Sequence, residues 1–221
     1  MAKRRFWSAV AMLLLLVLIP CSVVRAEPVT YAQPAAFDVE TLSGQYAMLF
    51  DLDSGTVLVS KNTGMRVYPA STTKIMTCIL ALENGTLSDV VTMGEEILQI
   101  SDDSSTADLS VSEQMTLEDL LYGLMLSSGN DAANAIAVYI AGSVDAFVNM
   151  MNEKAAELGC TNTHFTNPHG LNNPNHYSTA RDMVTITKYA MSLPLFTEIT
   201  STTADNYYPV GHPEKEKTAN T

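Results

Sequence analysis

The sequence has few cysteines and few basic residues, and both shortages exclude classes of protein. Three cysteines in 221 residues are too few for a disulfide framework, and only two of them follow residue 26. Twelve lysines and arginines stand against 24 aspartates and glutamates. Four of those twelve lie within residues 1–26, so the rest of the chain carries a net charge near −16. Such an acidic surface repels nucleic acid, and we expect no nucleic-acid partner.

Histidines and cysteines show no pattern typical of a metal site. His164, His169 and His176 are separated by five and seven residues within a segment rich in proline and asparagine, which matches no standard zinc spacing. Cys78 lies in an apolar stretch, as a buried thiol would, and the sequence leaves a disulfide with Cys160 open. We therefore expect no metal at these residues.

An apolar run near the N-terminus is typical of an export signal. Three basic residues precede the apolar segment 6–19, and V-R-A at 24–26 resembles a signal peptidase site. The run is shorter than the roughly 20 residues of a membrane span, although an uncleaved anchor stays an alternative. Cys21 suggests a lipoprotein signal, but Pro20 stands where a small residue is needed. We predict a signal peptide over residues 1–26 and an extracytoplasmic protein.

The remainder is expected to form one domain that mixes strands and helices. Residues 27–43 are polar and contain proline, as a linker would. Two strand-like runs at 46–51 and 56–60 flank a glycine turn and predict a hairpin. An apolar run at 75–82, introduced by Pro69, predicts a buried helix. The other expected elements are a helix from Thr116 to a break at Gly129, a closely packed helix from residue 130, a helix over Asp145–Leu158, a loop over 162–177, a helix from Thr179 to about Leu193, and a strand at Tyr207–Val210.

Ser71 and Lys74, three residues apart in Y-P-A-S-T-T-K-I-M-T (68–77), are the first candidate catalytic pair. On a helix this spacing places both side chains on one face, so the lysine amine can reach the serine hydroxyl. A serine becomes a good nucleophile when a base takes its proton, and a lysine with a lowered pKa can be that base. The first helical turn would also offer backbone N–H groups to an oxyanion. About one such spacing arises by chance in a chain this long, so a solvent-facing lysine beside an ordinary serine stays the alternative.

Ser128-Gly129-Asn130 is the second candidate motif, at the break between two predicted helices. Ser128 could relay a proton there, and Asn130 could bind a substrate amide. The alternative is a simple turn, because serine, glycine and asparagine are common turn residues.

These motifs occur together with two further segments. Y-P-A-S-T-T-K-I-M-T is followed by D-L-L-Y-G-L-M-L-S-S-G-N-D-A-A, F-T-N-P-H-G-L and H-Y-S-T-A-R-D-M. In this order, from about residue 34 onward, the chain resembles the serine-type D-alanyl-D-alanine carboxypeptidases, which are low-molecular-mass penicillin-binding proteins. The resemblance implies an α/β (α+β) fold of the β-lactamase/transpeptidase type, with a helical cluster against an antiparallel sheet. Residues 44–221 would then be part of the catalytic domain.

The resemblance also implies roles for the candidate residues. Ser71 would be the acyl-enzyme nucleophile, Lys74 the base that activates it, Ser128 a proton relay and Asn130 a substrate-binding residue, although which group takes the proton is disputed. The implied substrate is a peptidoglycan stem peptide ending in D-Ala-D-Ala, from which the terminal D-Ala is released. β-Lactam antibiotics would acylate the same serine. No metal or organic cofactor is implied, and the mode of membrane attachment stays open.

One part of the family pattern has no counterpart in the sequence. The Lys-Thr-Gly motif is missing, since K-T-A at 217–219 lacks the glycine. We therefore expect a chain cut off before that strand, with the C-terminal strands of the sheet missing and little or no turnover. A non-catalytic or decayed penicillin-binding fragment is one alternative. A β-lactamase is less favoured, because the deacylating glutamate motif E-x-x-L-N does not occur.

Overall fold

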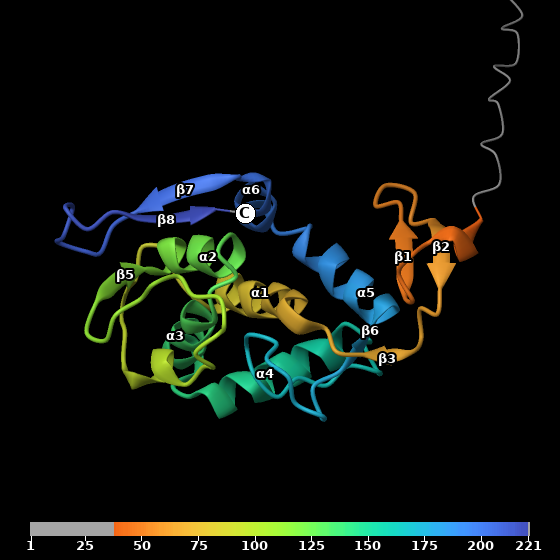
Figure 1. The fold of residues 1–221 in the computed structure, drawn as a ribbon, viewed down its shortest axis with the longest axis horizontal. Helices are drawn as coiled ribbons and strands as arrows, with labels where there is room; N and C mark the ends of the chain where they lie inside the picture. Colours follow the sequence, from red (N-terminus) through yellow and green to blue (C-terminus); the bar gives the residue numbers. More distant parts are fainter. Residues whose placement is uncertain (1–37, 221) are drawn as a thin grey trace, which may run out of the picture. The chain divides into compact units, whose positions relative to one another are not determined.

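A buried central helix, α1 (Lys74–Asn84), organises residues 38–220, the part of the chain that the computed structural model describes (Figure 1). Its residues Met76 and 78–81 are at most 2% exposed, as expected of a helix that is apolar on most of its faces. The prediction of a buried helix at 75–82 is therefore confirmed. Around it pack α2 (Leu117–Met125), α3 (Asn130–Ala141), α4 (Val144–Glu157), α5 (Ala180–Ala190) and α6 (Pro194–Ser201).

The predicted start of α2 and the break before α3 are both confirmed. The Thr116 hydroxyl accepts a hydrogen bond from the Asp119 N–H at 3.1 Å and so caps the first turn of α2. In α3, every residue from 130 to 137 is buried. Its many alanines let it approach α1, α2 and α4 closely, so α3 is the closely packed helix that the sequence predicted.

The last two helices are partly as predicted. Thr179 caps α5 by accepting from the Asp182 N–H at 3.0 Å, which confirms the predicted start. The helix predicted from Thr179 to about Leu193 ends earlier, at Ala190, and Pro194 is the first residue of a further helix, α6. A proline is well suited to this position, because the N–H that it lacks would have no partner within the helix.

The strands of residues 38–220 form four two-stranded antiparallel sheets. The predicted hairpin is confirmed as β1 (Ala47–Phe50) and β2 (Val57–Lys61), joined through Gly55, whose φ of +71° favours glycine. The prediction of a strand at Tyr207–Val210 is wrong, since the strand there ends at Tyr207. The remaining pairs are β3 (Arg66–Val67) with β6 (Ser178–Thr179), β4 (Val90–Thr92) with β5 (Gln114–Thr116), and β7 (Ala204–Tyr207) with β8 (Lys217–Asn220).

Three short 3-10 helices complete the described elements: η1 (Val39–Thr41), η2 (Ala70–Thr73) and η3 (Glu95–Leu98). The predicted signal peptide at 1–26 lies outside the described residues, and of the predicted linker only 38–43 are described. Within residues 38–220, no single helix has the length and apolar composition of a membrane span. Helices α3 and α4 meet that test only as a pair, across a bend of 85°.

Both described cysteines are free and buried. Cys78 is 0% exposed and Cys160 is 3% exposed, so the expected buried thiol is confirmed and the disulfide alternative is not realised. Burial raises the pKa of the Cys78 thiol to about 12 and that of Cys160 to about 11. Neither thiol is therefore a nucleophile at neutral pH.

Candidate active site

The Ser-Lys pair lies where η2 passes into α1. Ser71 is exposed on η2, whereas Lys74, the first residue of α1, is only 2% exposed. The Lys74 Nζ lies 3.4 Å from the Ser71 Oγ. The structure thus brings a buried amine within reach of an accessible hydroxyl, as the spacing of the two residues predicted.

Lys74 has two further partners, and both come from distant segments. Its Nζ donates to the Asn130 Oδ1 at 2.7 Å and to the backbone carbonyl of His169 at 3.0 Å. Burial lowers the pKa of Lys74 to about 8, and the nearby Asp131 carboxylate acts in the opposite direction. An appreciable fraction of the amine is therefore neutral near pH 7 to 8.

The contacts of the neutral amine define its orientation. A neutral amine keeps two N–H groups and one lone pair. The Asn130 Oδ1 and the His169 carbonyl oxygen can only accept, so they engage the two N–H groups. The lone pair then points in the third direction, toward the Ser71 hydroxyl. This arrangement would allow the neutral Lys74 amine to accept the serine proton.

Asn130 is held in place because it begins α3, next to a carboxylate that binds a neighbouring loop. Asp131 is 3% exposed, and its two oxygens accept from the Ala107 N–H at 2.7 Å and the Leu109 N–H at 3.0 Å. A side chain at Gly129 would place its Cβ 2.9 Å from the Ala107 nitrogen, so the loop approaches closely only because this residue is glycine. The S-G-N-D segment therefore fixes the position of Asn130 relative to α1.

Ser128 is near this group in sequence but does not bond to it in this structure. It is partly buried, and its φ of +54° places it in the left-handed region. Its hydroxyl makes no hydrogen bond to any residue of 38–220, and the same holds for the side-chain nitrogen of Asn130. Both groups are thus available as hydrogen-bonding partners for a bound molecule.

The segment from Thr166 to His176 is bound to η2 and α1 by side chains of both. The Thr77 hydroxyl donates to the Pro168 carbonyl at 2.6 Å. His176 accepts at Nδ1 from the Thr166 N–H at 3.0 Å, so its Nε2 carries the proton and donates to the Thr73 hydroxyl at 2.8 Å. Burial, with a smaller contribution from His164, lowers the pKa of His176 to about 4, which keeps this ring neutral. These bonds place the His169 carbonyl against Lys74.

Residue 170 must be a glycine for the 166–176 segment to lie this close to η2. Its φ is +93°, and a Cβ there would lie 1.9 Å from the Ala70 carbonyl oxygen. Ala70 itself has a positive φ of 48°, so the backbone just before Ser71 is strained. The sequence does not predict a part for His169-Gly170 in the site, because a backbone carbonyl has no side-chain signal. The one available clue was a glycine after Pro168 in a loop.

Among residues 38–220, the side chain of His169 has no hydrogen bond to Ser71 or to Lys74. Its Nδ1 accepts from the Leu171 N–H at 3.1 Å. Burial, then the charge of Lys74 and the neighbouring His176, lower the pKa of His169 to about 4. Among residues 38–220, no three or more histidine, cysteine or acidic side chains are grouped so that they could hold a metal ion.

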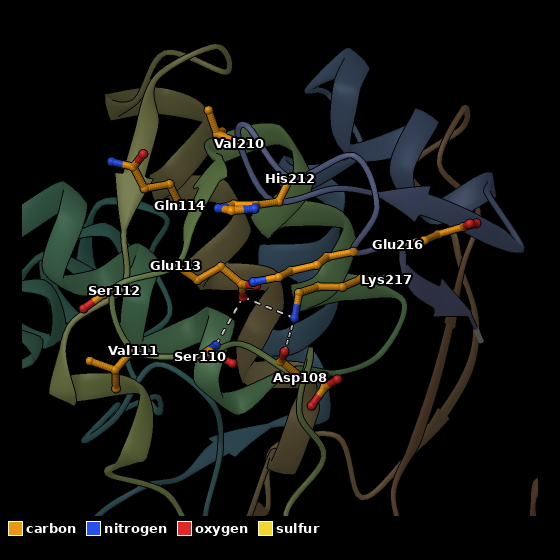
Figure 2. A pocket seen from close by; sticks show the side chains of 11 residues that line it. Asp108, Ser110, Val111, Ser112, Glu113, Gln114, Val210, His212, Glu216 and Lys217 are labelled. Atoms are coloured by element: carbon orange, nitrogen blue, oxygen red, sulfur yellow. Dashed lines mark hydrogen bonds and ion pairs between the residues drawn. The ribbon is translucent and has the colours of Figure 1, made fainter.

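A separate hollow of about 450 Å³ lies between the segment before β5 and the β7–β8 hairpin (Figure 2). Lys217, from the K-T-A sequence, points into it. Its Nζ lies 3.2 Å from the Glu113 Oε2 and donates to the Asp108 carbonyl. Glu113 also accepts from the Ser110 N–H at 3.2 Å. Lys217 is therefore bound by partners of its own and makes no ion pair or hydrogen bond with Ser71 in the described structure.

Comparisons with known proteins agree on one family. A family model described as D-alanyl-D-alanine carboxypeptidase matches residues 30–214. The carboxypeptidase DacF of Bacillus subtilis is 42% identical over 164 residues, which cover 72% of this chain and 42% of that protein. DacB2 of Mycobacterium tuberculosis is 39% identical over 153 residues, which cover 68% of this chain and 52% of the relative.

Solved structures give the same answer for the fold. The Streptomyces K15 DD-transpeptidase superposes with a TM-score of 0.75 at 32% identity, covering 82% of this chain and 74% of that one. Penicillin-binding protein 5 from Haemophilus influenzae gives a TM-score of 0.71 at 38% identity, covering 80% and 52%. The predicted transpeptidase-like fold is therefore confirmed. The chain spans about half or less of the length of the curated relatives named above.

Proposed function

From the premise that this chain belongs to the D-alanyl-D-alanine carboxypeptidase family, we propose that it releases the terminal D-alanine from peptidoglycan stem peptides ending in D-Ala-D-Ala. Ser71 is the proposed nucleophile. The observation that supports this best is the environment of Lys74, whose buried amine has a pKa near 8, two fixed acceptors, and Ser71 in its remaining direction.

The proposed reaction has two halves. In the first, neutral Lys74 takes the Ser71 proton while Oγ bonds to the carbonyl carbon of the penultimate D-Ala. The backbone N–H of Ser71 is the proposed donor to the oxyanion, since the N–H groups of Thr72 and Lys74 already donate to backbone carbonyls. The carbon–nitrogen bond then breaks, the proton passes to the leaving amine, and D-Ala departs. In the second half, water adds to the ester, Ser71 leaves with a proton, and the shortened peptide is released.

Ser128 and Asn130 complete the proposed site. The Ser128 hydroxyl, which has no protein partner among residues 38–220, is suited to pass the proton from Lys74 to the leaving nitrogen. Asn130 uses its oxygen for Lys74, which leaves its amide nitrogen to donate to a substrate carbonyl. This division of roles is supported by the Asn130 oxygen being bonded to Lys74 while its amide nitrogen has no hydrogen-bond partner among residues 38–220.

The wider predictions follow the same proposal. β-Lactams, which carry a reactive cyclic amide, are proposed to acylate Ser71. Because the substrate is a wall component, we propose that the protein acts outside the cytoplasm. The relatives described above are carboxypeptidases, a transpeptidase and a penicillin-binding protein, which does not favour a β-lactamase or a decayed fragment.

The test is covalent labelling with a fluorescent β-lactam, together with D-Ala release from a peptide ending in D-Ala-D-Ala. We expect labelling of the unchanged chain and none of Ser71→Ala. Ser88→Ala is the matched control, because Ser88 is an exposed serine outside the site, and it should label normally. A folded chain without a label, or equal labelling of both variants, would sink the proposal.

A further inference from the structure

A second pocket, of about 510 Å³, lies beside the strand that leads into Ser71. It is lined by the three tyrosines Tyr46, Tyr68 and Tyr177, by Arg66, and by neighbouring residues of β3 and of the segment before β6. Strands β3 and β6 lie next to each other in Figure 1. Neither the proposed reaction nor the packing of the core uses these side chains.

The strand register explains why three of these groups, Arg66, Tyr68 and Tyr177, meet. In the β3–β6 pair, Arg66 is opposite Thr179. Alternate residues of a strand share a face, so Arg66 and Tyr68 project to the same side, and Tyr177 is the diagonal neighbour of Arg66 on that side. The Arg66 Cζ accordingly lies 4.1 Å from the centre of the Tyr177 ring.

This stacking leaves the hydrogen-bonding edge of Arg66 free. A guanidinium stacked on a ring uses its face, whereas its N–H groups point outward in its plane. Arg66 is exposed, and its side chain forms no ion pair or hydrogen bond with residues 38–220. By contrast, Lys154 and Lys217 are each paired with glutamates. The in-plane edge of the Arg66 guanidinium fits a carboxylate.

The pocket is close enough to Ser71 to contact the same peptide. Tyr68 is three residues before Ser71, so their Cα atoms are at most about 11 Å apart. An extended peptide advances roughly 3.3 Å per residue. A substrate held with its penultimate carbonyl at Ser71 is therefore long enough for the residues two or three positions earlier to reach this pocket. Tyr68 is 62% exposed and Tyr46 is 40% exposed, so their rings are available to cover the aliphatic part of such a residue.

We propose that this pocket is a subsite for a carboxylate-bearing residue of the peptide substrate, two or three positions before the penultimate D-alanine. Arg66 binds the carboxylate through its free edge, and the tyrosines cover the attached carbon chain. This inference rests on the function proposed for Ser71 and adds to it a means of selecting longer, acidic peptides.

Binding can be measured without turnover on the full chain carrying Ser71→Ala. Two peptides ending in D-Ala-D-Ala are compared, identical except for a carboxylate or its carboxamide at the two candidate positions. We expect the carboxylate peptide to bind about fivefold more tightly at low salt, as for a partly exposed ion pair. Adding Arg66→Gln should reduce that ratio to about one. Arg181→Gln, which removes an exposed arginine outside the pocket, should leave the ratio unchanged.

Three results would overturn the subsite: equal affinity for the two peptides, no measurable binding of either, or the same loss of preference with Arg181→Gln as with Arg66→Gln. β-Lactam labelling of the chain with Ser71 intact tests the proposed function separately. A chain that labels but does not discriminate between the peptides refutes the subsite alone. A chain that discriminates but does not label refutes the acyl-enzyme proposal and leaves the subsite supported.

Discussion

Acylation of Ser71 should accelerate on the order of 100-fold between pH 6 and pH 9, because in the proposed reaction only neutral Lys74 takes the serine proton. Burial lowers the pKa of Lys74 to about 8, against the opposing effect of Asp131. With that pKa, about 1% of the amine is neutral at pH 6 and about 90% at pH 9. A lysine at its ordinary pKa would be neutral in well under about 0.1% of molecules at pH 7, compared with about 10% here. Because the pKa is lowered, the rate rises with pH and levels off above 8.

The assay is the second-order rate of labelling by a fluorescent β-lactam from pH 6 to pH 9.5. Lys74→Arg should not label at any of these pH values, because a guanidinium keeps its proton. Lys188→Arg, at an exposed position on α5, is the matched control and should reproduce the unchanged profile. A rate that is flat over this range, or that still rises tenfold per unit above pH 9, would refute the reasoning.

Three other substitutions or treatments test the same structure. Asn130→Asp places a carboxylate at the oxygen that lies 2.7 Å from the lysine amine, so the midpoint of the labelling profile should move up by about one unit or more; an unchanged midpoint contradicts this. Gly170→Ala should destabilise by more than about 2 kcal/mol in thermal unfolding, because it adds a clash to an unfavourable φ. Gly55→Ala is its control, with a similar φ of +71° and no atom within 4 Å of the added Cβ; equal losses would show that the clash is unimportant. Cys78 and Cys160, buried with raised pKa values, should react with a thiol reagent only after denaturant is added, and rapid reaction of the native chain would contradict their burial.

The helices could be predicted because their signals are local. Thr116 and Thr179 cap helices through residues three positions away, so the sequence nearby contains the information. The strands β3 and β6 are different, because each has two residues and exists only by pairing across more than 100 positions. Such short paired strands depend on tertiary contacts, and they cannot be predicted from local composition or from an alternation of apolar and polar residues. No helix was predicted from Pro194, because a proline is common both just after the end of one helix and at the first position of the next.

The same distinction holds within the site. The side chains of Ser71, Lys74 and Asn130 were predicted as candidates, and the structure brings all three together through the lysine amine. Their catalytic roles stay proposals. The third partner of Lys74 is a main-chain carbonyl, at His169, and every residue has one. The His169 carbonyl becomes the partner of Lys74 only when the loop is folded and Gly170 packs against Ala70 of η2.

The hydrogen bonds between the 166–176 segment and α1 make the activation of Ser71 a late event in folding. Lys74 binds partners 56 and 95 positions further along the chain, and neither can be present until the helical cluster has closed around it. Before then its amine is hydrated and protonated, and Ser71 is as inert as any other serine. A chain held unfolded by a chaperone would therefore expose no activated serine. In refolding experiments, capture of a β-lactam should appear with the final closure of the loop and not with the earlier growth of helical signal.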